Sequence, residues 1–198
     1  MTQIAEDNNE LPIERHPWPP FVPDGAKILF MGTFPPGCHR WSMDFYYPNP
    51  TNDFWRIMGL LYFGDKNALW FPDKKRFDLP AIKELLTEHG IAMNDTARAV
   101  RRLKGNASDK FLEIVEPVVL DDLLALMPEC RNVVTTGEKA AGVMAEQTGT
   151  PIPKMGDNVV TESGITLWRM PSTSRAYPMA VEKKAEWYRK VLVAAGCL

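Results

Sequence analysis

Four short, largely apolar runs constrain the fold of this chain most strongly. Runs of this length that end at a turn residue are typical of strands buried on both faces of a sheet. The predicted strands are 28–31, 91–93, 132–135 and 166–170. Segments with helical spacing alternate with them, and the predicted helices are 52–61, 79–88, 120–126, 138–147 and 178–195. This alternation predicts an α/β fold, a three-layer α/β/α sandwich around a central, mainly parallel four-stranded sheet.

Length and proline content predict one domain preceded by an extended arm. The chain has 198 residues, which is enough for one sizeable hydrophobic core. Residues 16–23 read HPWPPFVP, which cannot form a helix. We therefore expect an extended N-terminal arm at 1–25, a single domain at 26–198, and a monomer. We expect the last helix to begin at Pro178, because proline fits the first turn of a helix.

The balance of charge excludes some classes of protein. The chain carries 23 Lys and Arg against 25 Asp and Glu, which excludes a polycation but not a binder with a local basic face. Two segments, 96–110 and 169–190, are basic, whereas 111–130 has five acidic residues and no basic one. No apolar run approaches the roughly 18 residues of a membrane span. We expect a cytoplasmic protein without membrane contact.

Cysteine and histidine give little support for a metal or a cofactor. The three cysteines, Cys38, Cys130 and Cys197, form no C-x-x-C pair, and the three histidines form no H-E-x-x-H motif. We therefore expect free thiols in a reducing compartment, no metal site and no cofactor.

The segments that follow the predicted strands are the candidate sites, because parallel α/β sheets bind ligands at the carboxyl ends of their strands. These segments are 32–37, 94–95, 136–137 and 171–177. The first reads GTFPPG, and its residues Gly32, Thr33 and Phe34 would present backbone N–H groups to an anion. The same loop is also explained as a tight turn.

An aromatic segment at 45–56, FYYPNPTNDFWR, leads into a predicted helix. Its Tyr47 offers a flat face to a base flipped out of DNA. Its Asn52 offers an amide that orients a water molecule or a base edge. Both residues also fit plain structural roles, Tyr47 in packing and Asn52 as a helix N-cap.

The segment MPSTSRAY at 170–177 combines small hydroxyl residues with an arginine ahead of the last helix. Ser172, Thr173 and Ser174 suit a phosphate group. Arg175 suits a DNA groove or the gap that a flipped nucleotide leaves. The segment also fits a capping turn beside an exposed arginine.

Three of these segments together resemble the uracil-DNA glycosylase superfamily, in particular its mismatch-specific uracil/thymine and hypoxanthine/uracil branches. YPNPTNDFW at 47–55 is similar to the family's aromatic-x-x-Pro-x-Asn-x-Phe-Trp segment. MPSTSRAY is similar to its second DNA-contacting motif, and GIAMND at 90–95 to its middle strand. The resemblance covers residues 26–195 and implies an α/β DNA glycosylase of base-excision repair.

The first loop departs from the mismatch-specific branch. That branch has a catalytic Asn in a G-x-N-P-G pattern, whereas Phe34 stands at this position here. The hypoxanthine branch also lacks that Asn and has its catalytic Asn in the aromatic loop, at the position of Asn52. The resemblance therefore implies Asn52 as the principal catalytic residue.

The implied reaction is hydrolysis of the N-glycosidic bond of a flipped deaminated base, uracil or hypoxanthine, in DNA. Asn52 would position the water, and Asp95 would assist it or contact the base edge, unless this carboxylate only caps a turn. The implied base pocket consists of Gly32, Thr33, Phe34, Tyr47 and Thr136. The implied DNA contacts are Ser172, Thr173, Ser174 and Arg175. No lysine occurs in these segments, so we expect no Schiff-base lyase step.

Two other classes of function are open from the sequence. GTFPPGCH at 32–39 also resembles the G-T-F-D-P-x-H loop of nucleotidyltransferases, and PSTSR resembles their S-S-T-x-I-R segment, which would imply an ATP-dependent enzyme. However, His39 lies one place late, and Trp41 stands nearest to the second His of their H-x-G-H motif. The third class is a non-catalytic nucleic-acid or nucleobase binder on the same fold.

Overall fold

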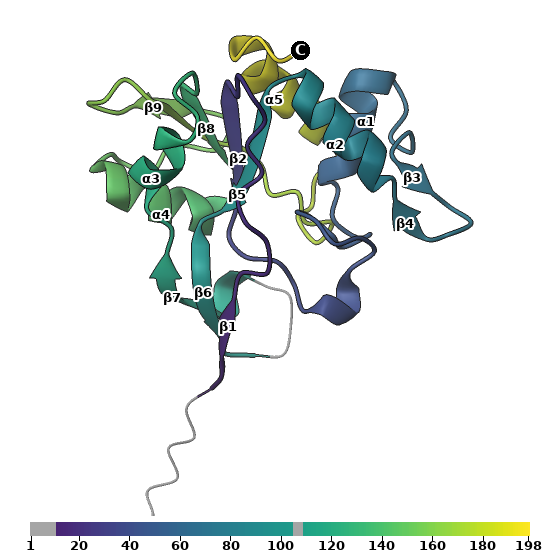
Figure 1. Ribbon diagram of the computed structural model, residues 1–198, viewed down its shortest axis with the longest axis horizontal. Helices are drawn as coiled ribbons and strands as arrows, with labels where there is room; N and C mark the ends of the chain where they lie inside the picture. The colour runs from purple at the N-terminus through teal and green to yellow at the C-terminus, as the bar shows by residue number, and fades with distance from the viewer. Residues whose placement is uncertain (1–10, 105–108) are drawn as a thin grey trace, which may run out of the picture.

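A five-stranded sheet formed by the described residues organises the protein (Figure 1). The computed structural model describes residues 11–104 and 109–198, so the first ten residues of the predicted arm lie outside the described residues. In spatial order the strands are β5 (Ile91–Asp95), β2 (Ile28–Gly32), β8 (Asn132–Thr135), β10 (Thr166–Arg169) and β9 (Asn158–Val160). The first four pair in parallel, which confirms the α/β prediction with a mainly parallel sheet.

The predicted number of strands, four, is wrong because β9 adds a fifth to the central sheet. β9 pairs antiparallel with β10 at the sheet edge. It has only three residues, and its Val160 is 64% exposed. It therefore lacks the buried apolar run on which the other strand predictions rest.

Helices cover both faces of this sheet. One face carries α1 (Phe54–Phe63), α2 (Leu79–Glu88) and α5 (Val181–Ala194), and the other carries α3 (Leu120–Ala125) and α4 (Glu138–Thr148) (Figure 1). Successive residues of β2 point to opposite faces. Phe30 accordingly joins the core beneath α1 and α5, whereas Leu29 joins the core beneath α3 and α4. The predicted three-layer sandwich is confirmed.

The last helix begins later than predicted. α5 starts at Val181, three residues after Pro178. The Met179 N–H bonds to the Tyr177 carbonyl at 2.7 Å, so the chain around Pro178 forms a tight turn. Ala180 then has extended backbone, with φ −60° and ψ 148°. Proline fixes φ but not ψ, which is why its presence did not start the helix here.

Residues 11–25 of the predicted arm are extended but pack on the domain. A second sheet consists of β1 (Ile13–Arg15), β6 (Ala97–Arg102) and β7 (Leu112–Pro117), with antiparallel pairing throughout. Farther along the arm, Phe21 and Met93 exchange backbone hydrogen bonds of 3.0 and 2.9 Å. The arm therefore runs along β5 and covers that edge of the central sheet.

Smaller elements complete the described part of the chain. β3 (Trp70–Phe71) and β4 (Arg76–Phe77) form an antiparallel hairpin, and 3₁₀ turns span Cys38–Arg40 and Asp109–Phe111. Within the described ranges, no helix has both the length and the apolar character needed to cross a bilayer.

Replacing Phe30 with alanine should lower the free energy of unfolding by about 3–5 kcal/mol. The ring is fully buried and packs between Phe54 and Tyr188, with centroid distances of 5.3 and 6.0 Å. Urea denaturation measures the loss. Phe63→Ala is the matched control because Phe63 is 54% exposed, and it should change the stability by less than about 0.5 kcal/mol. Equal losses in the two variants would contradict this core assignment.

Candidate functional site

One cavity of about 1050 Å³ opens at the carboxyl ends of the central parallel strands. Parallel α/β sheets bind their ligands at this edge. Every residue that the sequence analysis named for catalysis, base binding or DNA binding lines this cavity: Gly32, Thr33, Phe34, Tyr47, Asn52, Asp95, Thr136, Ser172, Thr173, Ser174 and Arg175. The fold thus brings together residues from five separate segments of the chain.

Gly32 allows two polar side chains to meet beside the end of β2. It lies opposite Asp95 in the parallel register of β2 and β5. A Cβ atom on Gly32 would lie 2.6 Å from Asp95 Oδ1 and 3.3 Å from the Tyr47 hydroxyl. Any larger residue would displace the carboxylate, so the glycine leaves room for Asp95 Oδ1 and the Tyr47 hydroxyl at the cavity floor.

The ring of Tyr47 is held in one orientation. It stacks on Phe54 with a centroid distance of 4.1 Å and an interplanar angle of 8°. Its hydroxyl shares a hydrogen bond of 2.9 Å with Thr136 Oγ1. Burial, and then the nearby Asp95 carboxylate, raise the pKa of the Tyr47 phenol well above its usual value, so the phenol is neutral. Because Phe54 covers one face of the ring, only the opposite face can receive a base.

The N-cap position of α1, for which the sequence offered Asn52, is occupied by Asp53, and the Asn52 side chain caps the helix from the preceding position. Its Oδ1 accepts a hydrogen bond of 2.9 Å from the Phe54 N–H at the start of α1. No acceptor for its Nδ2 is found among the residues that the structure describes. The cap therefore fixes the side chain and leaves the amide N–H groups for a ligand in the cavity.

Asp95 is held from below by a residue that sequence reasoning missed. Its Oδ2 lies 3.0 Å from Nε2 of His16, and both side chains are less than one-tenth exposed. His16 belongs to the N-terminal arm, 79 residues away along the chain. The only signal in the sequence is its place at the start of the proline-rich segment, and nothing there indicates a partner on another strand.

Asp109 is a second carboxylate of the cavity that the sequence analysis did not select. Thr33 Oγ1 donates a hydrogen bond of 2.7 Å to Asp109 Oδ2. The residue as a whole is exposed, but it lines the cavity, and its carboxyl group is partly buried against Thr33. This partial burial, and then the Asp95 carboxylate, raise the pKa of Asp109, while the bond from Thr33 opposes the rise. Asp109 is the one acidic residue in the basic segment 96–110, a weak signal.

The fold also brings two lysines to the cavity from outside the predicted segments. Lys110 and Lys139 line it. The Lys139 ammonium donates to the backbone carbonyl of Asp109 at 2.9 Å and to that of Leu112. Because two backbone carbonyls accept from this ammonium group, Lys139 has a structural role here. Within the described residues, no group of three or more His, Cys, Asp or Glu side chains is placed to hold a metal ion.

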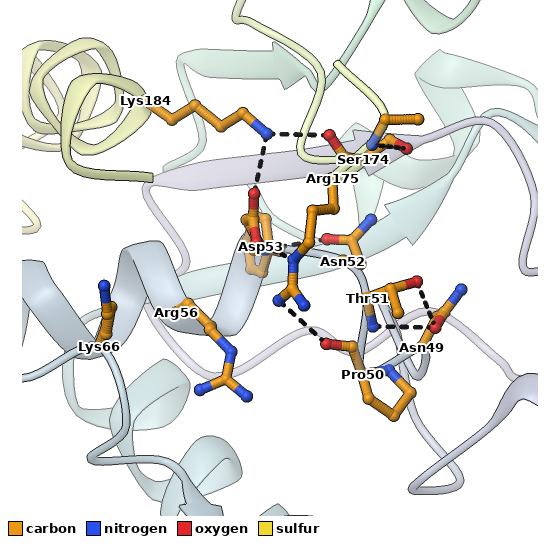
Figure 2. A network of polar contacts seen from close by, with 12 residues as sticks. Asn49, Pro50, Thr51, Asn52, Asp53, Arg56, Lys66, Ser174, Arg175 and Lys184 are labelled. Atoms are coloured by element: carbon orange, nitrogen blue, oxygen red, sulfur yellow. Dashed lines mark hydrogen bonds and ion pairs between the residues drawn. The ribbon is translucent and has the colours of Figure 1, made fainter. Parts of the chain in front are cut away.

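A buried ion pair joins the two loops at the rim of the cavity (Figure 2). Lys184 is fully buried, and its ammonium donates to Asp53 Oδ2 and to the Ser174 carbonyl, both at 2.9 Å. Arg175 Nε donates to the other oxygen of Asp53 at 3.2 Å. The Asp53 N–H also bonds to the Thr173 carbonyl at 2.7 Å. The aromatic loop and the segment 170–177 are therefore one structural unit.

The contacts within this unit leave some polar groups of segment 170–177 exposed to solvent and bury others. The Arg175 side chain is 52% exposed, and it also donates to the Pro50 carbonyl at 3.3 Å (Figure 2). Thr173 is only 2% exposed. The hydroxyl oxygens of Ser172 and Ser174 accept backbone N–H bonds, so each hydroxyl hydrogen can still be donated to a phosphate.

The described residues have an α/β fold like that of a solved structure from the uracil-DNA glycosylases. The chain is similar to the solution NMR structure of a candidate uracil-DNA glycosylase from Methanosarcina acetivorans, with a TM-score of 0.59 and 22% identity over 89% of this chain and 95% of that chain. It is also similar to hypoxanthine DNA glycosylase from Methanosarcina barkeri, with 26% identity over 130 residues, 65% of this chain and 74% of that protein. A scan against protein-family models finds no match. The resemblance to the superfamily is thus confirmed as a distant one.

Replacing Lys184 with methionine should destabilise the protein by about 3–5 kcal/mol, because it leaves the buried Asp53 carboxylate without its main partner. Denaturant unfolding measures the change. Lys183→Met is the matched control, since Lys183 is the exposed neighbour on the same helix. If both variants unfold at the same denaturant concentration, the buried pair does not hold the two loops together.

Proposed function

We propose that the protein is a DNA glycosylase that hydrolyses the N-glycosidic bond of an extruded deaminated base, uracil or hypoxanthine. The observation that carries this proposal is the convergence of Tyr47, Asn52, Asp95 and the loop at Gly32 on one cavity at the strand ends. The names of the two similar proteins point to the same two bases. The proposed activity joins these two independent lines of support.

The flipped base is expected to stack on the free face of Tyr47, opposite Phe54. In this position its edge approaches Asp95 Oδ1, which lies beside Gly32. Uracil and hypoxanthine both carry a ring N–H next to a carbonyl group, and a carboxylate accepts this N–H. Cytosine and adenine carry a lone pair at the equivalent ring nitrogen, which a carboxylate repels. Asp95 would therefore select deaminated bases over their undamaged parents.

The chemical step needs stabilisation of a departing anion and a positioned water. The glycosidic bond breaks with its electron pair on the base, and backbone N–H groups at Thr33 and Phe34 are the candidate donors to that negative charge. Asn52 Nδ2 donates to a water that then adds to C1′ of the sugar. The proton that this water loses neutralises the released base. Ser172, Ser174 and Arg175 at the rim would hold the DNA backbone.

The position of His39 does not support the nucleotidyltransferase alternative. His39, the residue nearest to the motif of those enzymes, is exposed and is not among the cavity-lining residues. Its ring instead lies against Gly37, where a Cβ atom would be 2.9 Å away. An imidazole pair that clamps phosphates at the carboxyl edge would therefore have to come from other residues.

A cleavage screen tests the proposal directly. Duplexes and single strands that carry uracil, hypoxanthine or a mismatched thymine are incubated with the protein, treated with alkali and separated on a gel. We expect strand breaks after alkali at uracil or hypoxanthine, and none in undamaged strands. Binding without breaks would favour the non-catalytic alternative. Pyrophosphate release from ATP with a nucleotide acceptor would favour the nucleotidyltransferase alternative.

Asn52→Ala should reduce the single-turnover cleavage rate by about 100-fold or more, because it removes the donor to the water. The lost helix cap costs about 1 kcal/mol, so thermal unfolding is recorded in parallel. Thr51→Ala is the control, since Thr51 is exposed, its side chain bonds only to Asn49, and its backbone bond from the Arg175 N–H is kept in the variant. A wild-type rate in Asn52→Ala would remove Asn52 from the mechanism.

A further inference from the structure

We propose that His16, in the N-terminal arm, is the positioning residue for Asp95. Its Nε2–H holds Asp95 Oδ2, so that Oδ1 alone is presented to the base. The arm would then be part of the active site rather than a tail beside it. The inference rests on the proposed function for the identity of the ligand, but the contact between His16 and Asp95 stands independently of it.

The hydrogen bonds of His16 make Nε2 the donor. Asp95 Oδ2 is an acceptor at 3.0 Å from Nε2. On the other side of the ring, the Trp18 backbone offers Nδ1 an acceptor at 2.9 Å and a donor at 3.3 Å. Nδ1 is therefore satisfied either as a donor or as an acceptor. In the neutral ring and in the charged ring alike, Nε2 keeps its hydrogen for Asp95.

Aromatic side chains prevent the His16 ring from turning away. The ring stacks on Tyr46 with a centroid distance of 5.6 Å, and the edges of Trp18 and Phe34 meet it at 5.6 and 5.5 Å. The backbone is fixed as well, because the His16 N–H bonds to the Arg98 carbonyl at 2.8 Å directly after β1. The rings of Trp18, Phe34 and Tyr46 thus form an aromatic cage around His16, which holds its ring in one orientation.

A buried carboxylate needs such a support. Asp95 is 6% exposed, and a carboxylate removed from water is costly unless a donor compensates it. Among the described residues, the ion-pair partner found for Asp95 is His16. The neighbouring phenols of Tyr46 and Tyr47 and the carboxyl group of Asp109 also interact with Asp95, but none of these three groups is a cation. His16 is therefore the partner that compensates Asp95 and at the same time fixes which oxygen faces the cavity.

The contact predicts a pattern across three variants of the full chain. His16→Phe keeps an aromatic ring in the cage but removes the donor, and it should lower the single-turnover rate by about 10- to 100-fold. His16→Gln returns a donor close to the position of Nε2 and should recover most of the rate. His39→Phe, at an exposed histidine, should behave as wild type. Affinity for substrate DNA should stay unchanged in all three, because the proposed phosphate contacts lie at the rim.

Two results with an active enzyme would overturn the proposal. One is a wild-type rate in His16→Phe. The other is a His16→Gln rate as low as that of His16→Phe, because a donor would then not be what matters. A parallel loss of DNA affinity and thermal stability in His16→Phe would likewise reduce the residue to a structural role.

A spectroscopic experiment separates this proposal from the proposed function. The chain has three histidines, so the ring nitrogen signals of His16 can be assigned by NMR with the single variants. Asp95→Asn should shift the Nε2 signal of His16 and leave those of His39 and His89 in place. An unshifted His16 signal overturns the contact. If the signal shifts but no lesion is cleaved, the proposed glycosylase activity fails while the pairing of His16 with Asp95 stands.

Discussion

Parallel pairing of β2 with both β5 and β8 is the constraint on which the site depends. It sends the carboxyl ends of three strands to one edge of the sheet, and its register sets Gly32 opposite Asp95. A shift by one residue would turn each strand's side chains to the other face, so the buried cores on both sides protect the register. The polar residues of the cavity are therefore held in place by apolar packing several residues away.

The buried pair of Asp53 and Lys184 fixes the positions of the two loops that follow the sheet edge. Both loops anchor apolar side chains in the core, among them Tyr46 and Met170, and the ion pair adds a polar link between their outer parts. One ammonium group bonds to a carboxylate of the aromatic loop and to a carbonyl of the other loop, and a backbone bond from Asp53 adds to it. Such pairs are costly to bury and are of more use for specifying one arrangement than for net stability.

The main features of the fold follow from local pattern, and the missed features depend on contacts between distant residues. Among the described residues, the four buried strands were predictable from their apolar runs, and the five α-helices from the helical spacing of their apolar residues. β9 was not, since three half-exposed residues have no such periodicity. The cavity-lining residues followed from one topological rule about strand ends. His16 and Asp109 did not, because each meets its partner across more than 70 residues of chain.

Tyr47 has a φ of 52°, in the left-handed region where a large side chain is uncommon and costs free energy. A glycine would relax the backbone there but would remove the aromatic surface. The stacking of the ring on Phe54 and its hydrogen bond to Thr136 offset this backbone cost, since a buried aromatic ring contributes about 3–5 kcal/mol and a strained φ costs of order 1–3 kcal/mol. The same packing that stabilises the protein therefore keeps a flat surface in place against which a nucleobase can rest.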